Sequence, residues 1–192
     1  MIEDVPPAIP ERAPSEPRPL VRLGCGAAGL IAAAGVAATI GLHLDALAGV
    51  AFVLVLAVIC VFDLEQMRVP NQIVVPAIAV ALIWQIAFHR SDLPWVLGAA
   101  VGGGLFFGIA AVLTRGSIGM GDAKLAVLIG LVLGEDIVAA LFFATLAGAA
   151  ADGVVLWRHG RAAGKTPMPY APFLAAGAVI ALLVGTSSPI LH

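Results

Sequence analysis

The sequence predicts an all-α protein: a bundle of about six or seven transmembrane helices with its N-terminus in the cytoplasm. Hydrophobic residues make up 61% of the 192 residues and charged residues only 11%, and the mean hydropathy is +1.06. This composition excludes an ordinary soluble domain. The apolar residues form several runs long enough to cross a bilayer. The few basic residues are unevenly distributed between the loops, which predicts the orientation.

The N-terminal segment 1–19 is the only long polar stretch, and it holds six of the 13 prolines. Such a composition cannot build a core, so we expect a disordered cytoplasmic tail over 1–19 and a transmembrane domain over 20–192. A secretory signal peptide is not expected, because this acidic, proline-rich start lacks a basic n-region.

Six apolar runs have the length of a membrane span. They cover residues 22–42, 46–63, 71–88, 94–113, 136–157 and 169–186. A shorter run, 122–133, would rise only about 18 Å at 1.5 Å per residue, which is too little for a full crossing without help. It either crosses as a short seventh segment or re-enters the side from which it came.

The basic residues favour the crossing. If 122–133 crosses and the N-terminus is inside, only Arg90 of the ten basic residues lies outside the membrane. If it does not cross, Arg158, Arg161 and Lys165 move outside and the asymmetry is lost. The positive-inside rule therefore favours seven segments, with the N-terminus inside and the C-terminus outside.

Two acidic residues lie at the ends of apolar runs. Asp63 ends the second run and Asp122 begins the short one. Two crossings separate them, so both should lie at the same face. Either acid could simply anchor or cap a helix. A carboxylate in a membrane segment is costly, however, by roughly 2.5–3.5 kcal/mol at a helix centre, so a functional role is the default interpretation. Two adjacent carboxyl groups that share a proton can act as general base and general acid in hydrolysis.

The residues around Asp122 suit such a site. Gly119 and Gly121 have no Cβ atoms, so they allow a sharp turn and the close approach of a peptide backbone. Lys124 could change the pKa of the Asp122 carboxyl group, or it could bind lipid phosphates, and the sequence does not distinguish these roles.

Three blocks together resemble the prepilin peptidases, membrane aspartyl proteases with a Gly-X-Gly-Asp signature. The blocks are Phe62 to Asn71, Gly119 to Leu125, and Pro169 to Phe173, in which Ala171 replaces the family's usual glycine. The resemblance implies that Asp63 and Asp122 are the catalytic acids. The residues that would shape the site around them are Pro70, Asn71, Gly119, Gly121, Lys124, Pro169 and Pro172.

The resemblance also implies a substrate and a location. The enzyme would remove the leader of a type IV prepilin or pseudopilin, after a glycine, at the cytoplasmic face of the bacterial inner membrane. Its partners would be that substrate, the lipid bilayer and the pilus assembly machinery. We expect no cofactor, no metal and no nucleic acid, and His43, His89, His159 and His192 show no ligand spacing.

The cysteines indicate a branch of the family. Larger members carry two Cys-X-X-Cys pairs that bind zinc, associated with N-methylation of the new N-terminus. This sequence has only Cys25 and Cys60. It therefore resembles the short, peptidase-only branch that serves Flp-type tight-adherence pili, and methyltransferase activity is not expected.

Several alternatives remain open. Asp152, inside the fifth long run, is a rival catalytic acid, and Glu65 is expected to be solvated. The pairs Gly98/Gly102 and Gly104/Gly108 are predicted to be close helix contacts. Rival functions are a non-catalytic membrane component of a pilus or secretion machine and a small proton-coupled transporter. The latter often shows an inverted repeat, and we find none in this sequence.

We expect reporters at residue 1 and after Arg161 to be cytoplasmic, and reporters after Glu135 or His192 to be periplasmic, because of the asymmetry of the basic residues. Paired phosphatase and fluorescent-protein fusions would measure this. A cytoplasmic signal after Glu135 would show that 122–133 is re-entrant.

Overall fold

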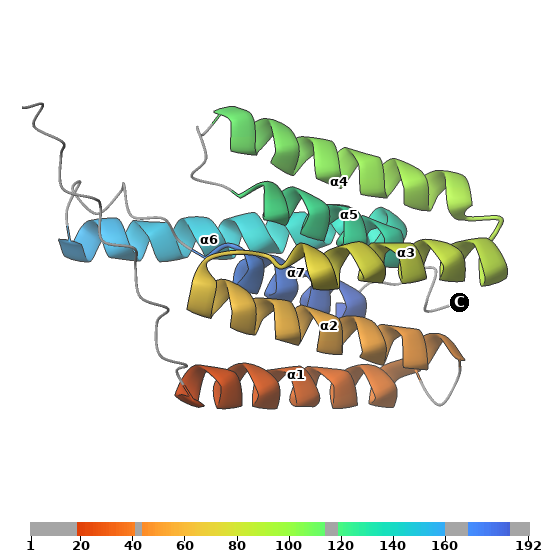
Figure 1. Ribbon diagram of the computed structural model, residues 1–192, viewed down its shortest axis with the longest axis horizontal. Coiled ribbons are helices and arrows are strands. Elements are labelled where there is room, and N and C mark those ends of the chain that lie inside the picture. Colours follow the sequence, from red (N-terminus) through yellow and green to blue (C-terminus); the bar gives the residue numbers. More distant parts are fainter. Residues whose placement is uncertain (1–18, 41–43, 114–118, 160–168, 185–192) are drawn as a thin grey trace, which may run out of the picture.

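The computed structural model describes residues 19–40, 44–113, 119–159 and 169–184, and all of its regular structure is helical. Successive helices run in alternating directions along one common axis (Figure 1), which confirms the predicted all-α bundle. The described elements are α1 (Pro19–Ile40), α2 (Leu44–Gln66), α3 (Asn71–Phe88), α4 (Leu93–Leu113), α5 (Met120–Leu133), the 3₁₀ turn η1 (Gly134–Asp136), α6 (Ile137–His159) and α7 (Ala171–Val184). Of the expected tail, residues 1–18 lie outside the described part.

Five helical stretches are long and apolar enough to cross a membrane, and α7 is a shorter apolar helix. The last of the five, Met120–Ala151, contains both α5 and the first part of α6. These two helices run in opposite directions (Figure 1), because the chain turns at Gly134, which has φ 57° and ψ −123°. The 122–133 segment, as α5, is therefore one of the helices that alternate in direction along the bundle.

The short helix α5 is the centre of the bundle. Ten of its 14 residues are buried, and it contacts α3, α4 and α7. Glycines bring α4 and α5 close together. A Cβ added at Gly130 would lie 2.6 Å from the Ala100 backbone, and one at Gly103 would lie 3.3 Å from the Ala126 carbonyl oxygen. Backbones that approach this closely are typical of helix pairs in membranes.

The predicted glycine contacts on α4 are only partly right. Gly104 packs against Val127 and Ala123 of α5, as expected. Gly98, Gly102 and Gly108 have no atom within 4 Å of an added Cβ, so these three face open space. The prediction failed because α4 is apolar all round, so its sequence does not show which face meets α5.

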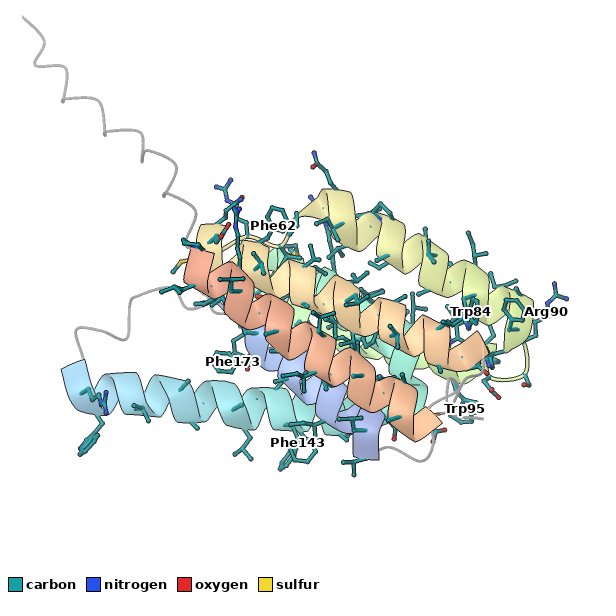
Figure 2. The ribbon with its side chains drawn as sticks, turned by 90° about the horizontal axis from the view of Figure 1, so that it is seen from below. Phe62, Trp84, Arg90, Trp95, Phe143 and Phe173 are labelled. Carbon is teal, nitrogen blue, oxygen red and sulfur yellow. The ribbon has the colours of Figure 1, made fainter. Side chains whose placement is uncertain are left out.

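The two ends of the bundle differ in charge. We call the end where α2 finishes and α3, α5 and α7 begin the acid end, since Asp63 and Asp122 lie there. Of the five basic residues that the structure describes, Arg90 is at the opposite end, near Trp84 and Trp95 and far from Phe62 (Figure 2). The other four, at positions 22, 68, 124 and 158, lie at the acid end. This distribution fits the predicted orientation.

The prediction that the Glu65 side chain is solvated was wrong. Glu65 lies in the last turn of α2, and its side chain is only 8% exposed. Its carboxylate accepts two hydrogen bonds from the Arg22 guanidinium of α1, at 2.7 Å and 3.0 Å. The pair joins α1 to the end of α2.

We expect Gly134→Ala to lower the stability of the protein by about 1–3 kcal/mol, because a φ of 57° with a ψ of −123° is essentially restricted to glycine. Thermal unfolding in detergent would measure it. Gly98→Ala is the matched control, because Gly98 is helical and its Cβ would meet nothing within 4 Å. Equal melting temperatures for the two variants would contradict this explanation of the turn.

Candidate active site

Asp63 lies in the last turn of α2 and is held by a helix far away in the sequence. The residue is 4% exposed. Its Oδ2 accepts a hydrogen bond of 3.1 Å from the backbone N–H of Ala171, the first residue of α7. A carboxylate at a helix N-terminus meets both an available N–H and the positive end of the helix dipole. The sequence analysis missed this partner.

Asp122 lies in the first turn of α5 and is held by the turn that precedes it. The residue is 6% exposed. Its Oδ2 accepts a hydrogen bond of 3.1 Å from the N–H of Gly119, and its own N–H donates to the Gly119 carbonyl oxygen at 3.0 Å. The carboxylate thus makes one half of a capping box, since Gly119 has no side chain to complete the other half.

Asp63, near the end of α2, and Asp122, near the start of α5, lie at the same end of the bundle, where α2 finishes and α5 begins (Figure 1). Each is bound through Oδ2. Within the described residues, neither Oδ1 receives a hydrogen bond from the protein.

The segment between α2 and α3 packs against the start of α5. A Cβ added at Gly121 would lie 2.7 Å from the Val69 Cβ, so Gly121 is required by this close contact. Gly119 is different: it has an ordinary extended conformation, with φ −76° and ψ 146°. An added Cβ there would meet the Asp122 Oδ2 at 3.5 Å, an ordinary contact.

The beginning of α3 is also tied to α5. Lys124 Nζ donates a hydrogen bond of 2.7 Å to the Asn71 Oδ1. Pro70 is the N-cap of α3, and its carbonyl oxygen accepts from the N–H groups of Ile73 and Val74 at 3.0 Å and 3.1 Å. The sequence left two roles open for Lys124, and the structure adds a third: Lys124 joins the starts of α3 and α5.

Aromatic side chains fix the beginning of α7. The Tyr170 ring lies 5.7 Å from that of Phe107 and 5.9 Å from that of Phe173, measured between centroids. It also packs on Gly148 of α6, where an added Cβ would come within 2.9 Å of the ring. Pro169 precedes this helix, and Pro172 lies in its first turn, where the missing N–H of proline is tolerated.

The structure thus brings every predicted site residue to the acid end, on three junctions: the end of α2 with the start of α3, the start of α5, and the start of α7. It adds contacts that the sequence did not indicate, from Val69, the Ala171 backbone and Cys60, whose Sγ lies 3.8 Å from the Ala171 carbonyl oxygen. The sequence singled out Ala171 only as the residue that replaces the family's usual glycine before Pro172, and it did not indicate a role for the Ala171 N–H.

Asp152, the rival acid, belongs to α6, and its side chain lies outside those that the structure describes. Among the described residues, no three His, Cys, Asp or Glu side chains are grouped so that they could hold a metal ion.

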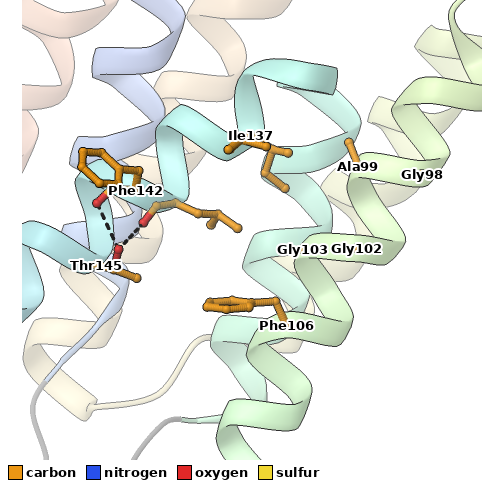
Figure 3. Close-up of a pocket in the computed structure, with 10 residues that line it drawn as sticks. Gly98, Ala99, Gly102, Gly103, Phe106, Ile137, Phe142 and Thr145 are labelled. Atoms are coloured by element: carbon orange, nitrogen blue, oxygen red, sulfur yellow. Dashed lines mark hydrogen bonds between the residues drawn. The ribbon is translucent and has the colours of Figure 1, made fainter.

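A separate apolar groove lies between α4 and α6 (Figure 3). Its volume is about 480 Å³. The only hydroxyl that lines it, that of Thr145, donates to the carbonyl oxygens of Leu141 and Phe142 in its own helix. Neither acid reaches this groove, so the candidate active site rests on the two carboxylates and their surroundings. The groove is lined by Gly98, Ala99, Gly102, Gly103, Phe106, Ile137, Val138, Leu141, Phe142 and Thr145.

Comparison with known proteins points to one family. The profile of the type IV leader peptidase family matches residues 50–152, which include both acids. A prepilin leader peptidase/N-methyltransferase of Bacillus subtilis (strain 168) is 38% identical over 161 residues, or 82% of this chain and 63% of the relative. One of the same description from Burkholderia pseudomallei (strain 1026b) is 33% identical over 174 residues, or 88% and 55%. The chain spans less than two thirds of these relatives' length. No solved structure matches the chain.

We expect Gly121→Ala to lower the peptidase activity that we propose below about tenfold or more, because the new methyl group must displace Val69 and with it the start of α5. Gly119→Ala should cost much less, within about threefold, because its backbone and surroundings accept a methyl group. Cleavage rates of the two purified variants on one substrate would measure the difference. A greater loss for Gly119→Ala would show that the contact with Val69 does not explain the second glycine.

Proposed function

Because the chain belongs to the type IV leader peptidase family, we propose that it is an aspartyl endopeptidase that works within the membrane. It removes the leader peptide of type IV prepilins or pseudopilins. The catalytic acids are Asp63 and Asp122. The proposal covers peptide hydrolysis only, because a pair of carboxylic acids can supply the general base and the general acid that hydrolysis needs.

One observation carries the proposal: two buried carboxyl groups, in the last turn of α2 and the first turn of α5, lie at the same end of the bundle, and each is bound through one oxygen to a backbone N–H. In addition, among the residues that the structure describes, no group donates a hydrogen bond to the second oxygen of either acid, and an acid–base pair needs such an oxygen for water or for the substrate.

The proposed reaction uses one shared proton. The ionised acid takes a proton from a water molecule, whose oxygen attacks the carbonyl carbon of the scissile bond. The protonated acid gives its proton to the carbonyl oxygen. As the tetrahedral intermediate collapses, the first acid returns its proton to the leaving nitrogen, the C–N bond breaks, and the second acid recovers its own. The reaction is the same for either assignment of the base and the acid to Asp63 and Asp122, because both are carboxylic acids.

The position of the acids suits a substrate that is itself a membrane helix. Gly104 of α4 packs against Ala123, next to Asp122, and α4 continues from there to Leu113, a further rise of about 13 Å. α4 therefore extends past the level of Asp122 at the acid end, so the acids lie deeper in the membrane than the end of α4. A leader could reach them from the cytoplasm while the apolar helix of the prepilin stays in the bilayer of the bacterial inner membrane.

By resemblance, we further propose that the cut follows a glycine and that the enzyme belongs to the short branch that serves Flp-type tight-adherence pili. Co-expression with the candidate prepilins of the host, with leader removal measured by mass spectrometry, would test the choice of substrate. Processing of none of them would contradict it.

We expect Asp63→Asn and Asp122→Asn each to lower cleavage at least about a hundredfold while the protein still accumulates in the membrane, because an amide can act neither as base nor as acid. Purified protein and a prepilin peptide in detergent would give the rates. Near wild-type cleavage by either variant would remove that residue from the mechanism.

Asp152→Asn is the control acid, and it should retain most of the activity. Chelators and thiol-alkylating reagents should leave hydrolysis intact, because the mechanism uses neither a metal nor a thiol. Loss of activity in Asp152→Asn at normal accumulation would assign a catalytic role to Asp152, and inactivation by a chelator would contradict the aspartyl mechanism.

A further inference from the structure

We propose that the backbone N–H of Ala171, at the start of α7, is the positioning group that holds the Asp63 carboxylate ready for catalysis. This inference rests on the proposed function, since it gives Ala171 a role in that reaction. The hydrogen bond of 3.1 Å joins residues that are 108 positions apart. It is the one hydrogen bond that the Asp63 carboxylate accepts within the described part of the chain.

Ala171 is the donor to Asp63 because the other residues in the first turn of α7 have no N–H available for another element. The first N–H groups of a helix have no partner inside the helix. Pro172 has no N–H at all. The N–H groups of Phe173 and Leu174 both donate to the Tyr170 carbonyl oxygen, at 3.1 Å and 3.2 Å. Ala171 therefore presents the one N–H of this turn that is directed to another element, and Asp63 receives it.

Contacts on both sides of Ala171 fix this donor in space. The residue is fully buried, with an exposed fraction of 0%. Its carbonyl oxygen lies 3.8 Å from the Sγ of Cys60, which precedes Asp63 by about one turn of α2. The preceding residue, Tyr170, is packed against Gly148 and Phe107. The position of Asp63 thus depends on α7 and, through Tyr170, on α4 and α6.

The alternative is that this hydrogen bond only stabilises the beginning of α7. A carboxylate that caps a helix gives that helix stability without any effect on catalysis. The two roles differ in what the loss of the N–H would change. Loss of a helix cap lowers the amount of folded protein, whereas loss of a positioning group lowers kcat of the folded enzyme.

The test removes a single N–H and keeps the shape of the chain. Ala171 is replaced by lactic acid through suppression of a stop codon in the full-length chain, so an ester takes the place of the amide. Leu174 replaced by its α-hydroxy analogue is the matched control. It is also fully buried, and its N–H donates to Tyr170 in the same turn. An ester at 171 also makes the Tyr170 carbonyl oxygen a weaker hydrogen-bond acceptor. The ester at 174 controls for this effect, because it removes a hydrogen bond to the same oxygen. Ala171→Gly retains the N–H and tests the methyl group alone.

We expect the ester at 171 to lower kcat about ten- to a hundredfold, the usual range for one hydrogen bond to a charged group. KM should stay within about twofold, since substrate binding is not altered. The ester at 174 and Ala171→Gly should both keep kcat within about threefold of wild type. Folded protein is quantified for each variant by gel filtration in detergent, and rates are given per folded molecule.

Three results would overturn the inference: an unchanged kcat with the ester at 171, equal losses with the esters at 171 and 174, or a change in KM alone. Asp63→Asn is measured in the same assay to separate this inference from the proposed function. If Asp63→Asn is inactive while the ester at 171 has full kcat, the peptidase function stands and Ala171 is not a positioning group. If Asp63→Asn cleaves like wild type, the proposed function itself fails.

Discussion

The structure depends on one constraint, which is that two carboxylic acids must be accommodated inside an apolar helix bundle. A buried polar group without hydrogen bonds is costly, so each acid needs a donor. In both cases the donor is a backbone N–H at or just before a helix start, Ala171 for Asp63 and Gly119 for Asp122. For Asp63 the donor belongs to a distant helix, so the end of α2 and the start of α7 have to meet, and the alternating directions of the helices make this meeting possible.

Glycine contacts set the spacing that this meeting requires. Gly130 brings the backbone of α5 against that of α4, and Gly121 lets the Val69 segment reach the first turn of α5. On the other side, Gly177 brings α7 against the Ala140 carbonyl oxygen of α6, while Gly148 makes room for the Tyr170 ring. Lipid chains are as apolar as the helices, so close packing rather than a hydrophobic driving force holds helices together in a membrane.

The sequence was sufficient for features that are carried by side-chain type. Apolar runs gave the helices, and Asp63 and Asp122 stood out because charged residues are rare in such runs. It was not sufficient for the Ala171 N–H, because a backbone donor has no residue signature. It also failed for Glu65, whose partner Arg22 lies 43 positions earlier. On α4, apolar on every face, the sequence pattern could not show that Gly103 rather than Gly102 meets α5.

The two acids are held in different ways, and this has a consequence for the site. Asp122 is bound by Gly119, three residues before it, so the start of α5 fixes that carboxylate locally. Asp63 is bound across the bundle by α7, and α7 is in turn placed by α6 and by the ring of Tyr170. A shift of α7 relative to α2 would therefore move the donor away from Asp63 and leave Asp122 in place. The packing of α7 thus sets the geometry of the pair. The site requires these long-range helix contacts as much as it requires the acids themselves.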